Sequence, residues 1–306
     1  VVSMVGFEKT EVVAQAGQPV AVRLKTASEL LGQVVVAASR VEESSLRSPV
    51  TVEKLDARAV RETPAANYFE ALNSLKGVDM VTSGLTYRQI NTRGFNSTGN
   101  SRFLQLIDGV DNQSPGLGFT PGNLFGVSDL DVESAELIPG AASALYGPVA
   151  FNGLLYTRTK SPFEFQGLSV EQKTGVNHVA SPVGDGPQPF TESSVRYARA
   201  FANRFAAKLN ASYLRGRDWY AADYTDIDPN TSPELRGANN AGANGLNVYG
   251  DEVAQTLPGI GRVSRTGYFE KDLTNYDVYC LRLSGAVHYR VTPTVEAIYA
   301  LNFTQG

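Results

Sequence analysis

The sequence predicts a β-rich chain, in which a compact αβ domain is followed by the first antiparallel strands of a transmembrane β-barrel. Residues 136–160, ELIPGAASALYGPVAFNGLLYTRTK, indicate a strand, a short helix and a second strand, with Gly and Pro at both junctions. After Gln166, apolar and polar residues alternate in runs of about ten residues, the length of a tilted membrane strand. The connections between these runs are alternately long and short.

Composition and charge exclude several classes of protein. The 306 residues include 27 basic and 31 acidic ones, so no nucleic-acid partner is expected. Cys280 is the single cysteine, which excludes an intrachain disulfide and a cysteine-based zinc site. No uncharged apolar run approaches the roughly 18 residues of a spanning helix, so membrane insertion would use strands. The chain starts inside a strand-like run and stops just after another, and we expect it to be a fragment of a longer polypeptide.

The first part of the chain holds short apolar runs. Three of them, separated by turn residues, predict a meander of short strands over residues 1–31. The next run, Val34–Ala38, is β-branched and precedes the polar residues 42–45, so we expect little local folding. Such a run is suited to adding as a strand to the edge of a partner's sheet. An ordinary short strand is the alternative, because apolar runs of this length are common.

Residues 45–165 are expected to form the αβ domain. A helix is predicted over Asn67–Leu75, where Phe69, Leu72 and Leu75 recur at helical spacing before Gly77. Strands are predicted at the runs 49–55, 78–81, 87–92, 103–107, 132–138 and 151–157. The 103–107 and 132–138 strands need a common sheet to bury their apolar faces.

Two short motifs lie within these strands. Arg93-Gly94 follows the third strand, and Asp108-Gly109 follows the fourth. Asp-Gly is also an ordinary turn signal. Arg93 is expected to be hydrogen-bonded or ion-paired, since a buried guanidinium without a partner is costly.

Residues 166–306 are expected to contribute five antiparallel strands. The apolar face should contact lipid through Leu209, Leu283, Tyr299 and Leu301. The other face should line the lumen, with Lys208, Arg282 and Glu296. Phe205 and Tyr213 lie at opposite ends of the apolar face, as two interfacial girdles require. A soluble sandwich also alternates, yet it gives no reason for regularly alternating loop lengths.

No catalytic constellation is present. His178 and His288 are the two histidines, too few for a histidine metal cluster, and no phosphate-cradling loop occurs. The run Asp226–Ser232 mimics the first positions of a calcium loop, but the Gly and Glu that complete it are missing. We therefore expect no enzyme activity, no metal and no cofactor.

Taken in order, the motifs resemble those of TonB-dependent outer-membrane receptors of the Bacteroidetes type. The 136–160 segment resembles the end of the plug domain, where Gly-x-Ala-Ser-Ala-Leu-Tyr-Gly leads to a closing Thr-Lys. The resemblance assigns the plug signature to Arg93, Gly94, Asp108, Gly109, Gly140, Tyr146 and Gly147. The run after Gln33 is similar to the TonB box, and the resemblance assigns TonB binding to Val34, Val35, Val36, Ala37, Ala38 and Ser39.

The resemblance implies four parts. These are the tail of a carboxypeptidase-like β-sandwich domain (1–31), the TonB box and linker (32–44), the plug (45–165), and the first strands and extracellular loops of a barrel (166–306). Five strands leave the barrel open, because a barrel with a plugged lumen has about 22. Pro139-Gly140-Ala141 stands where plugs commonly carry Arg-Gly-Pro, so a plug-locking arginine ion pair is not carried over.

The implied function is uptake of a scarce, bulky solute, such as a siderophore, cobalamin, metal complex or oligosaccharide, across the bacterial outer membrane. TonB, energised by ExbB and ExbD, would pull on the box, with the plug and N-terminal region facing the periplasm. Candidate ligand contacts lie at the plug apex and in a long loop: Asn96, Asn100, Asn112, Phe119, Trp219, Tyr220 and Tyr224. For the loop aromatics, packing of the loop against itself is the alternative. The rival function is surface binding or adhesion without transport, favoured if Val34–Ala38 is buried in a sheet.

Overall fold

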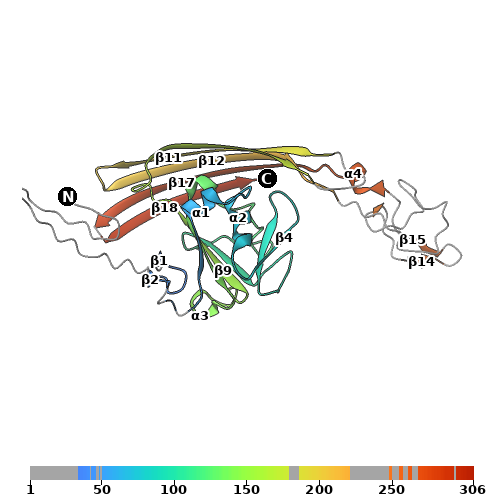
Figure 1. The fold of residues 1–306 in the computed structure, drawn as a ribbon, viewed down its shortest axis with the longest axis horizontal. Coiled ribbons are helices and arrows are strands. Elements are labelled where there is room, and N and C mark those ends of the chain that lie inside the picture. The colour runs from blue at the N-terminus through green and yellow to red at the C-terminus, as the bar shows by residue number, and fades with distance from the viewer. Residues whose placement is uncertain are drawn as a thin grey trace, which may run out of the picture.

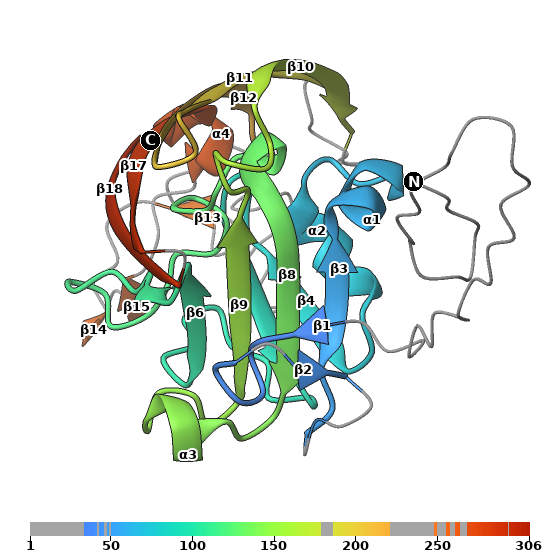
Figure 2. The ribbon, with the colours of Figure 1, turned by 90° about the vertical axis from the view of Figure 1, so that its left-hand side faces the viewer.

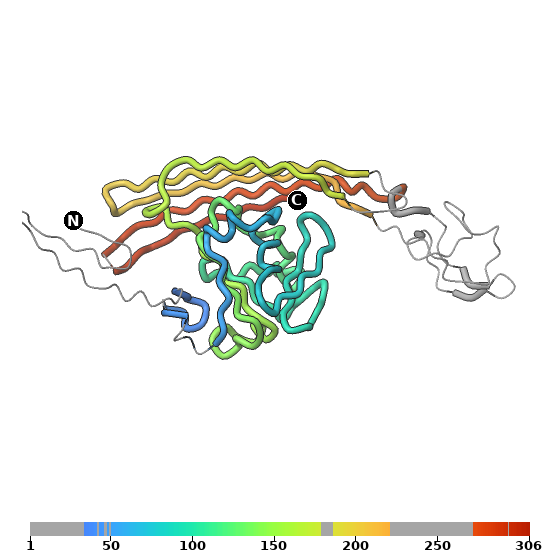
Figure 3. The backbone as a smooth tube through the Cα atoms, in the orientation of Figure 1, coloured from blue at the N-terminus to red at the C-terminus, as the bar shows by residue number. Residues whose placement is uncertain are grey.

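A computed structural model of the chain describes residues 34–41, 43–45, 48, 50–178, 186–220, 248–249, 255–257, 261–263, 268–292 and 294–306. Two five-stranded sheets dominate this part of the chain. The first belongs to an αβ domain, and the second, the wall sheet, arches over one side of that domain (Figure 1 and Figure 3). The expectations for residues 1–31, Tyr224 and the Asp226–Ser232 run lie outside the described residues.

The αβ domain is built on a mixed sheet with the strand order β3-β8-β9-β6-β7. Its strands are β3 (Glu53–Asp56), β6 (Phe103–Ile107), β7 (Val110–Asp111), β8 (Val132–Pro139) and β9 (Gly153–Thr159). β6 and β9 pair in parallel, and the other pairs are antiparallel. The predicted strands at 103–107 and 132–138 therefore do share one sheet.

One face of this sheet is covered by two short α-helices, a 3₁₀ helix and a β-hairpin. The covering elements are α1 (Ala57–Glu62), α2 (Tyr68–Ala71), the 3₁₀ helix η1 (Leu72–Ser74), and the hairpin of β4 (Val78–Thr82) and β5 (Arg88–Thr92). Phe69, Leu72, Leu137 and Leu155 are almost completely buried between them and the sheet. Burial of these side chains supplies the main hydrophobic stabilisation of the domain.

Side-chain caps decide where the two helices begin. The Asp56 carboxylate accepts the N–H groups of Arg58 and Ala59 at the start of α1, and Asn67 Oδ1 accepts the Glu70 N–H in α2. The α-helix predicted to run to Leu75 is shorter than expected. Its last turn tightens into the 3₁₀ helix, where the Ser74 hydroxyl donates to the Ala71 carbonyl at 2.7 Å.

The opposite face of the sheet is covered by a segment from the start of the described chain. β1 (Val34–Val35) pairs with β2 (Glu43–Ser44), and the chain between them turns against β8. The short helix α3 (Ser143–Tyr146) lies in the connection between β8 and β9, on the same side as this segment (Figure 2). Ala37, Ile138 and Leu154 form the core of this second layer.

The wall sheet is an antiparallel meander. Its strands are β10 (Gly167–Asn177), β11 (Gln188–Phe201), β12 (Phe205–Arg217), β17 (Asp277–Thr292) and β18 (Val295–Gln305). Tight turns join β11 to β12 and β17 to β18 at one end of the sheet (Figure 1). The connection from β12 to β17 is long. It includes β13 (Val248–Tyr249), β14 (Gln255–Leu257), β15 (Gly261–Val263), β16 (Tyr268–Phe269) and α4 (Glu270–Leu273).

The two faces of the wall sheet differ as predicted. On β12, Leu209 of the outer face is 66% exposed, whereas Lys208 of the inner face is 7% exposed. Phe205 lies directly opposite Tyr289 across the pair β12 and β17, so aromatic residues gather at the end with the tight turns. Within the described part of the chain, no helix is long and apolar enough to cross a membrane.

Candidate functional site

The centre of the candidate site is Glu136, a charged residue in the middle of β8. Its side chain is fully buried, and the register places it between Lys54 of β3 and Tyr156 of β9. A buried carboxylate needs hydrogen-bond donors and a counter-charge to offset its lost hydration. Lys54 Nζ supplies part of this charge, 3.3 Å from Glu136 Oε1.

The donors come from the segment Val34–Ser39, called here the docked segment. Glu136 Oε2 accepts the backbone N–H groups of Val36 at 2.7 Å and Ala37 at 2.9 Å. Lys54 also donates to the carbonyl oxygen of Val34. The docked segment therefore supplies both hydrogen bonds to Oε2, whereas Oε1 is buried without a hydrogen bond and faces Lys54.

Helix α3 holds the same segment from a second side. The Tyr146 hydroxyl donates to the Ala37 carbonyl at 2.9 Å. The Arg40 guanidinium donates to the Leu145 carbonyl at 2.5 Å and lies 4.7 Å from the centroid of the Tyr146 ring. Burial raises the pKa of Tyr146, so the phenol keeps the proton that it donates.

The expectation that this segment has little reason to fold locally is wrong. Val34 and Val35 form a short strand, and the following turn is closed by the Arg40 N–H donating to the Val36 carbonyl at 2.8 Å. Val35, Ala37 and Ala38 are buried. The segment folds because β8 offers it a buried acceptor and an apolar surface, neither of which is adjacent in sequence.

Both signature pairs form turns with left-handed backbone. Asp108 and Gly109 have φ of 50° and 85° and join β6 to β7, the pattern of a type I′ hairpin. The Asp108 carboxylate then accepts both the N–H (2.8 Å) and the hydroxyl (2.6 Å) of Thr159, which ties the end of β9 to this turn. The Asp-Gly motif is thus structural, and its carboxylate is occupied.

Arg93 was expected to be hydrogen-bonded or ion-paired, and this expectation is wrong. Its side chain is exposed, and it makes no side-chain hydrogen bond or ion pair to the described residues. Because the guanidinium is exposed, it needs no protein partner to offset lost hydration. The guanidinium instead lies over Gly140, whose φ is +110° and where an added Cβ would stand 2.6 Å from Arg93 Cζ. Gly147 also has a positive φ and ends α3 by donating its N–H to the Ser143 carbonyl.

The predicted apex contacts divide into free and occupied groups. Asn96 is exposed. Asn100 is buried, and its amide donates to Asn91 Oδ1 at 2.8 Å, so it is not available to a solute. Asn112 donates to the Phe125 carbonyl at 3.1 Å, and the half-buried Phe119 ring packs on Gly99. The two apex loops therefore pack against each other.

One of the loop aromatics packs within the loop, which was the alternative to a ligand contact. Tyr220 is buried and meets the Tyr276 ring edge-on, with centroids 5.8 Å apart, so it closes the base of the long connection. Trp219 is half-buried. Beside it, the Asp218 carboxylate accepts the Leu85 N–H at 2.7 Å, which joins this base to the αβ domain.

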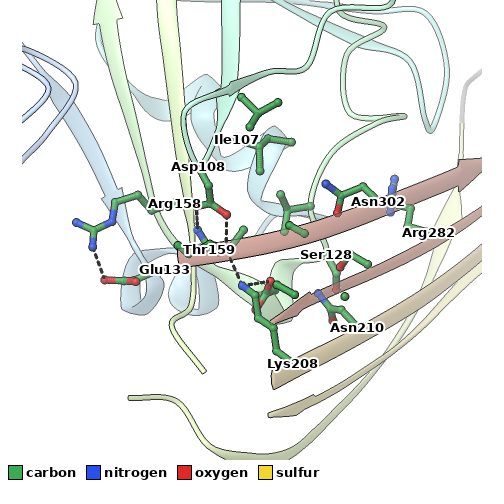
Figure 4. Close-up of a pocket in the computed structure, with 18 of the residues that line it drawn as sticks. Ile107, Asp108, Ser128, Glu133, Arg158, Thr159, Lys208, Asn210, Arg282 and Asn302 are labelled. Carbon is green, nitrogen blue, oxygen red and sulfur yellow. Dashed lines mark hydrogen bonds and ion pairs between the residues drawn. The ribbon is translucent and has the colours of Figure 1, made fainter. Parts of the chain in front are cut away.

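A cavity of about 830 Å³ separates the αβ domain from β12, β17 and β18. Figure 4 shows Asp108 and Thr159 on its domain side, and Asn210, Arg282 and Asn302 on its wall side. Among the described residues, both amide atoms of Asn210 are buried without a partner. The cavity is therefore lined in part by polar groups that can hydrogen-bond water.

Sequence reasoning missed the charged residues that join the parts. Glu136 lies within the apolar run Val132–Ile138, and a charge at that position is a signal for a buried partner. Asp131, the residue just before β8, forms ion pairs with Arg196 and Lys208 of the wall sheet. His288, expected to be solvated or to line the lumen, is on the inner face, with Nδ1 2.5 Å from Glu296 Oε1. No cluster of three or more potential metal ligands occurs among the described residues.

Comparison with known proteins places the αβ domain in a family context. Residues 44–154 match the model of the TonB-dependent receptor plug domain. The vitamin B12 transporter BtuB of Vibrio vulnificus is 27% identical over 183 residues, which cover 59% of this chain and 27% of that protein. The chain thus spans about a quarter of the length of this curated relative.

Solved structures share the fold. A double mutant of the ferric enterobactin receptor PfeA from Pseudomonas aeruginosa has a TM-score of 0.53 at 19% identity, over 89% of this chain and 34% of that chain. FpvA of P. aeruginosa, bound to a pyoverdine and iron, has a TM-score of 0.53 at 11% identity, over 89% and 36%. The predicted fold class, an αβ plug followed by an open antiparallel sheet of barrel type, is confirmed.

Proposed function

We propose that the chain is part of a TonB-dependent outer-membrane receptor, which binds a scarce, bulky solute and imports it to the periplasm. The observation that carries this proposal is the position of the αβ domain. A domain matching the plug model lies against the inner face of an antiparallel sheet whose outer face is apolar and exposed. An apolar outer face and a covered inner face suit a plugged barrel in lipid.

The solute class is taken from the relatives. One is named a vitamin B12 transporter, another is a ferric enterobactin receptor, and FpvA was solved bound to a pyoverdine and iron. We infer an iron–siderophore complex or a cobalamin as the solute, and no enzymatic step. The exposed Asn96 of the apex and the half-buried Trp219 are the predicted contacts whose side chains remain accessible.

The orientation follows from the connections. Barrels of the outer membrane have short periplasmic turns and longer extracellular loops. The tight turns of the wall sheet would then lie in the periplasm, and β1 and β2 lie toward that same end (Figure 1). This position supports TonB binding by Val34–Ser39, with ExbB and ExbD supplying energy from the inner membrane.

Burial of the docked segment is the observation that favours the rival function, binding or adhesion without transport. Val35→Pro in the full-length protein separates the two, because proline removes a backbone donor and fixes φ. We expect loss of uptake of labelled ferric siderophore or cobalamin, with surface binding at low temperature unchanged. Val41→Pro, at an exposed position just beyond the segment, is the control and should retain uptake. Normal uptake by Val35→Pro would contradict the role of this segment, and absence of uptake by the wild-type protein would favour the rival.

A further inference from the structure

The docked segment has most of its pairing groups already occupied. Glu136 accepts hydrogen bonds from the N–H groups of Val36 and Ala37. The Tyr146 hydroxyl donates to the Ala37 carbonyl. Lys54 donates to the Val34 carbonyl, while β2 pairs with Val34 and Val35. A partner that adds a strand to this segment needs these same backbone groups.

Docking on the αβ domain and pairing with a partner strand therefore exclude each other. We propose that Glu136 is the residue that sets this competition, by holding the segment in a form that the partner cannot pair with. This inference rests on the proposed function, which makes TonB the partner. Release of the segment then has to precede pairing, and the Glu136 carboxylate determines how much release costs.

The contacts single out Glu136 among the groups that hold the segment. Val36 and Ala37 donate to a fully buried carboxylate that faces Lys54, and charge-assisted bonds are about twice as strong as neutral ones. Buried Val35 and the methyl groups of Ala37 and Ala38 add an apolar contribution, which a change of Glu136 leaves in place. When the segment leaves, Oε2 loses both donors, and Lys54 alone faces the buried charge.

The test uses the full-length protein with a reporter cysteine. Cys280 is buried and is replaced by serine, and Ala38→Cys places a thiol at a position that is 3% exposed when the segment is docked. Glu136→Gln keeps the shape of the side chain but removes its charge. We expect labelling of the introduced thiol by a water-soluble maleimide to become about tenfold faster, since the docking equilibrium weakens by the loss of charge-assisted bonds.

Glu133→Gln is the matched control. Glu133 is on the same strand, is half-buried, and pairs with Arg158 at 3.8 Å without a bond to the docked segment. It should leave the labelling rate unchanged. Tyr146→Phe keeps the ring and removes one donor to the Ala37 carbonyl, so a rise of about threefold is expected, which tests docking of the segment through a second contact.

Binding of the purified periplasmic domain of TonB, measured without solute, completes the test. Glu136→Gln should bind it about tenfold more tightly than wild type, and Glu133→Gln should match wild type. Unchanged labelling in a folded Glu136→Gln variant would overturn the inference, whatever Tyr146→Phe shows. Faster labelling with no TonB binding by any variant would overturn the proposed partner, while the docking role of Glu136 would stand.

Discussion

Asp131 Oδ1 in the αβ domain lies 2.6 Å from Arg196 Nε in the wall sheet, and both side chains are buried. The other oxygen, Oδ2, lies 2.9 Å from Lys208 Nζ on the neighbouring strand. Lys208 also donates to the Thr159 hydroxyl and the Lys160 carbonyl. One carboxylate thus joins the domain to two strands of the wall.

Replacing Asp131 with Asn should be strongly destabilising. The substitution leaves two buried cations without a counter-charge, which costs about 3–5 kcal/mol of stability. The intact cluster itself adds little stability compared with apolar residues of similar size. The free energy of unfolding in urea, measured in detergent micelles, checks this. Asp111→Asn, at an exposed position, is the control. Equal stability of the two variants would show that the cluster is hydrated rather than buried.

Gly140→Ala should destabilise the αβ domain by about 1–3 kcal/mol, because φ of +110° strains any residue with a Cβ. The Arg93 guanidinium above it is the movable end of an exposed side chain, so adding Arg93→Ala should restore little. Gly116→Ala, where no atom lies within 4 Å of the new Cβ, is the control. Thermal unfolding of the three variants measures the difference, and full recovery by Arg93→Ala would mean that the clash, not the backbone, is responsible.

Leu209→Arg should impair insertion into lipid. Leu209 is 66% exposed on the outer face of β12, and a charge on the lipid face near mid-membrane depth costs about 2–4 kcal/mol. Refolding into lipid vesicles measures this loss. Leu117→Arg changes a leucine of similar exposure in an αβ-domain loop and should have little effect. Similar losses at both positions would argue against a lipid-facing outer surface.

Asp218 should give the stability a pH dependence. Burial raises the pKa of its carboxyl, against the opposing effects of the Leu85 N–H and Arg88. The folded state thus binds this proton more tightly than the unfolded state. The resulting stabilisation is complete below the ordinary pKa and is lost as the pH rises through the raised value.

Asp218→Asn removes this pH-dependent contribution to the free energy of unfolding. The free energy of unfolding of wild type should therefore fall relative to that of the variant as the pH rises above about 4. Urea unfolding at a series of pH values measures both curves. Curves that stay parallel over this range would contradict the prediction.

The fold class and the two faces of the wall sheet were predictable because they depend on local pattern. Alternation with a period of two determines which side of a strand each residue occupies, and Leu209 and Lys208 follow it. Asp108-Gly109 was predictable as a turn for the same reason, since its backbone conformation is a property of those residues.

The contacts of the candidate site were decided only by the tertiary structure. Val36 and Glu136 are 100 residues apart in sequence, and nothing near either residue indicates the other. Asn100 was predicted to contact the solute, but the fold brings Asn91 to its amide, and Arg93 needs no partner because the fold leaves it in water. A sequence pattern reports which side chains avoid water, whereas the partners of buried charges depend on which distant strands the sheet brings together.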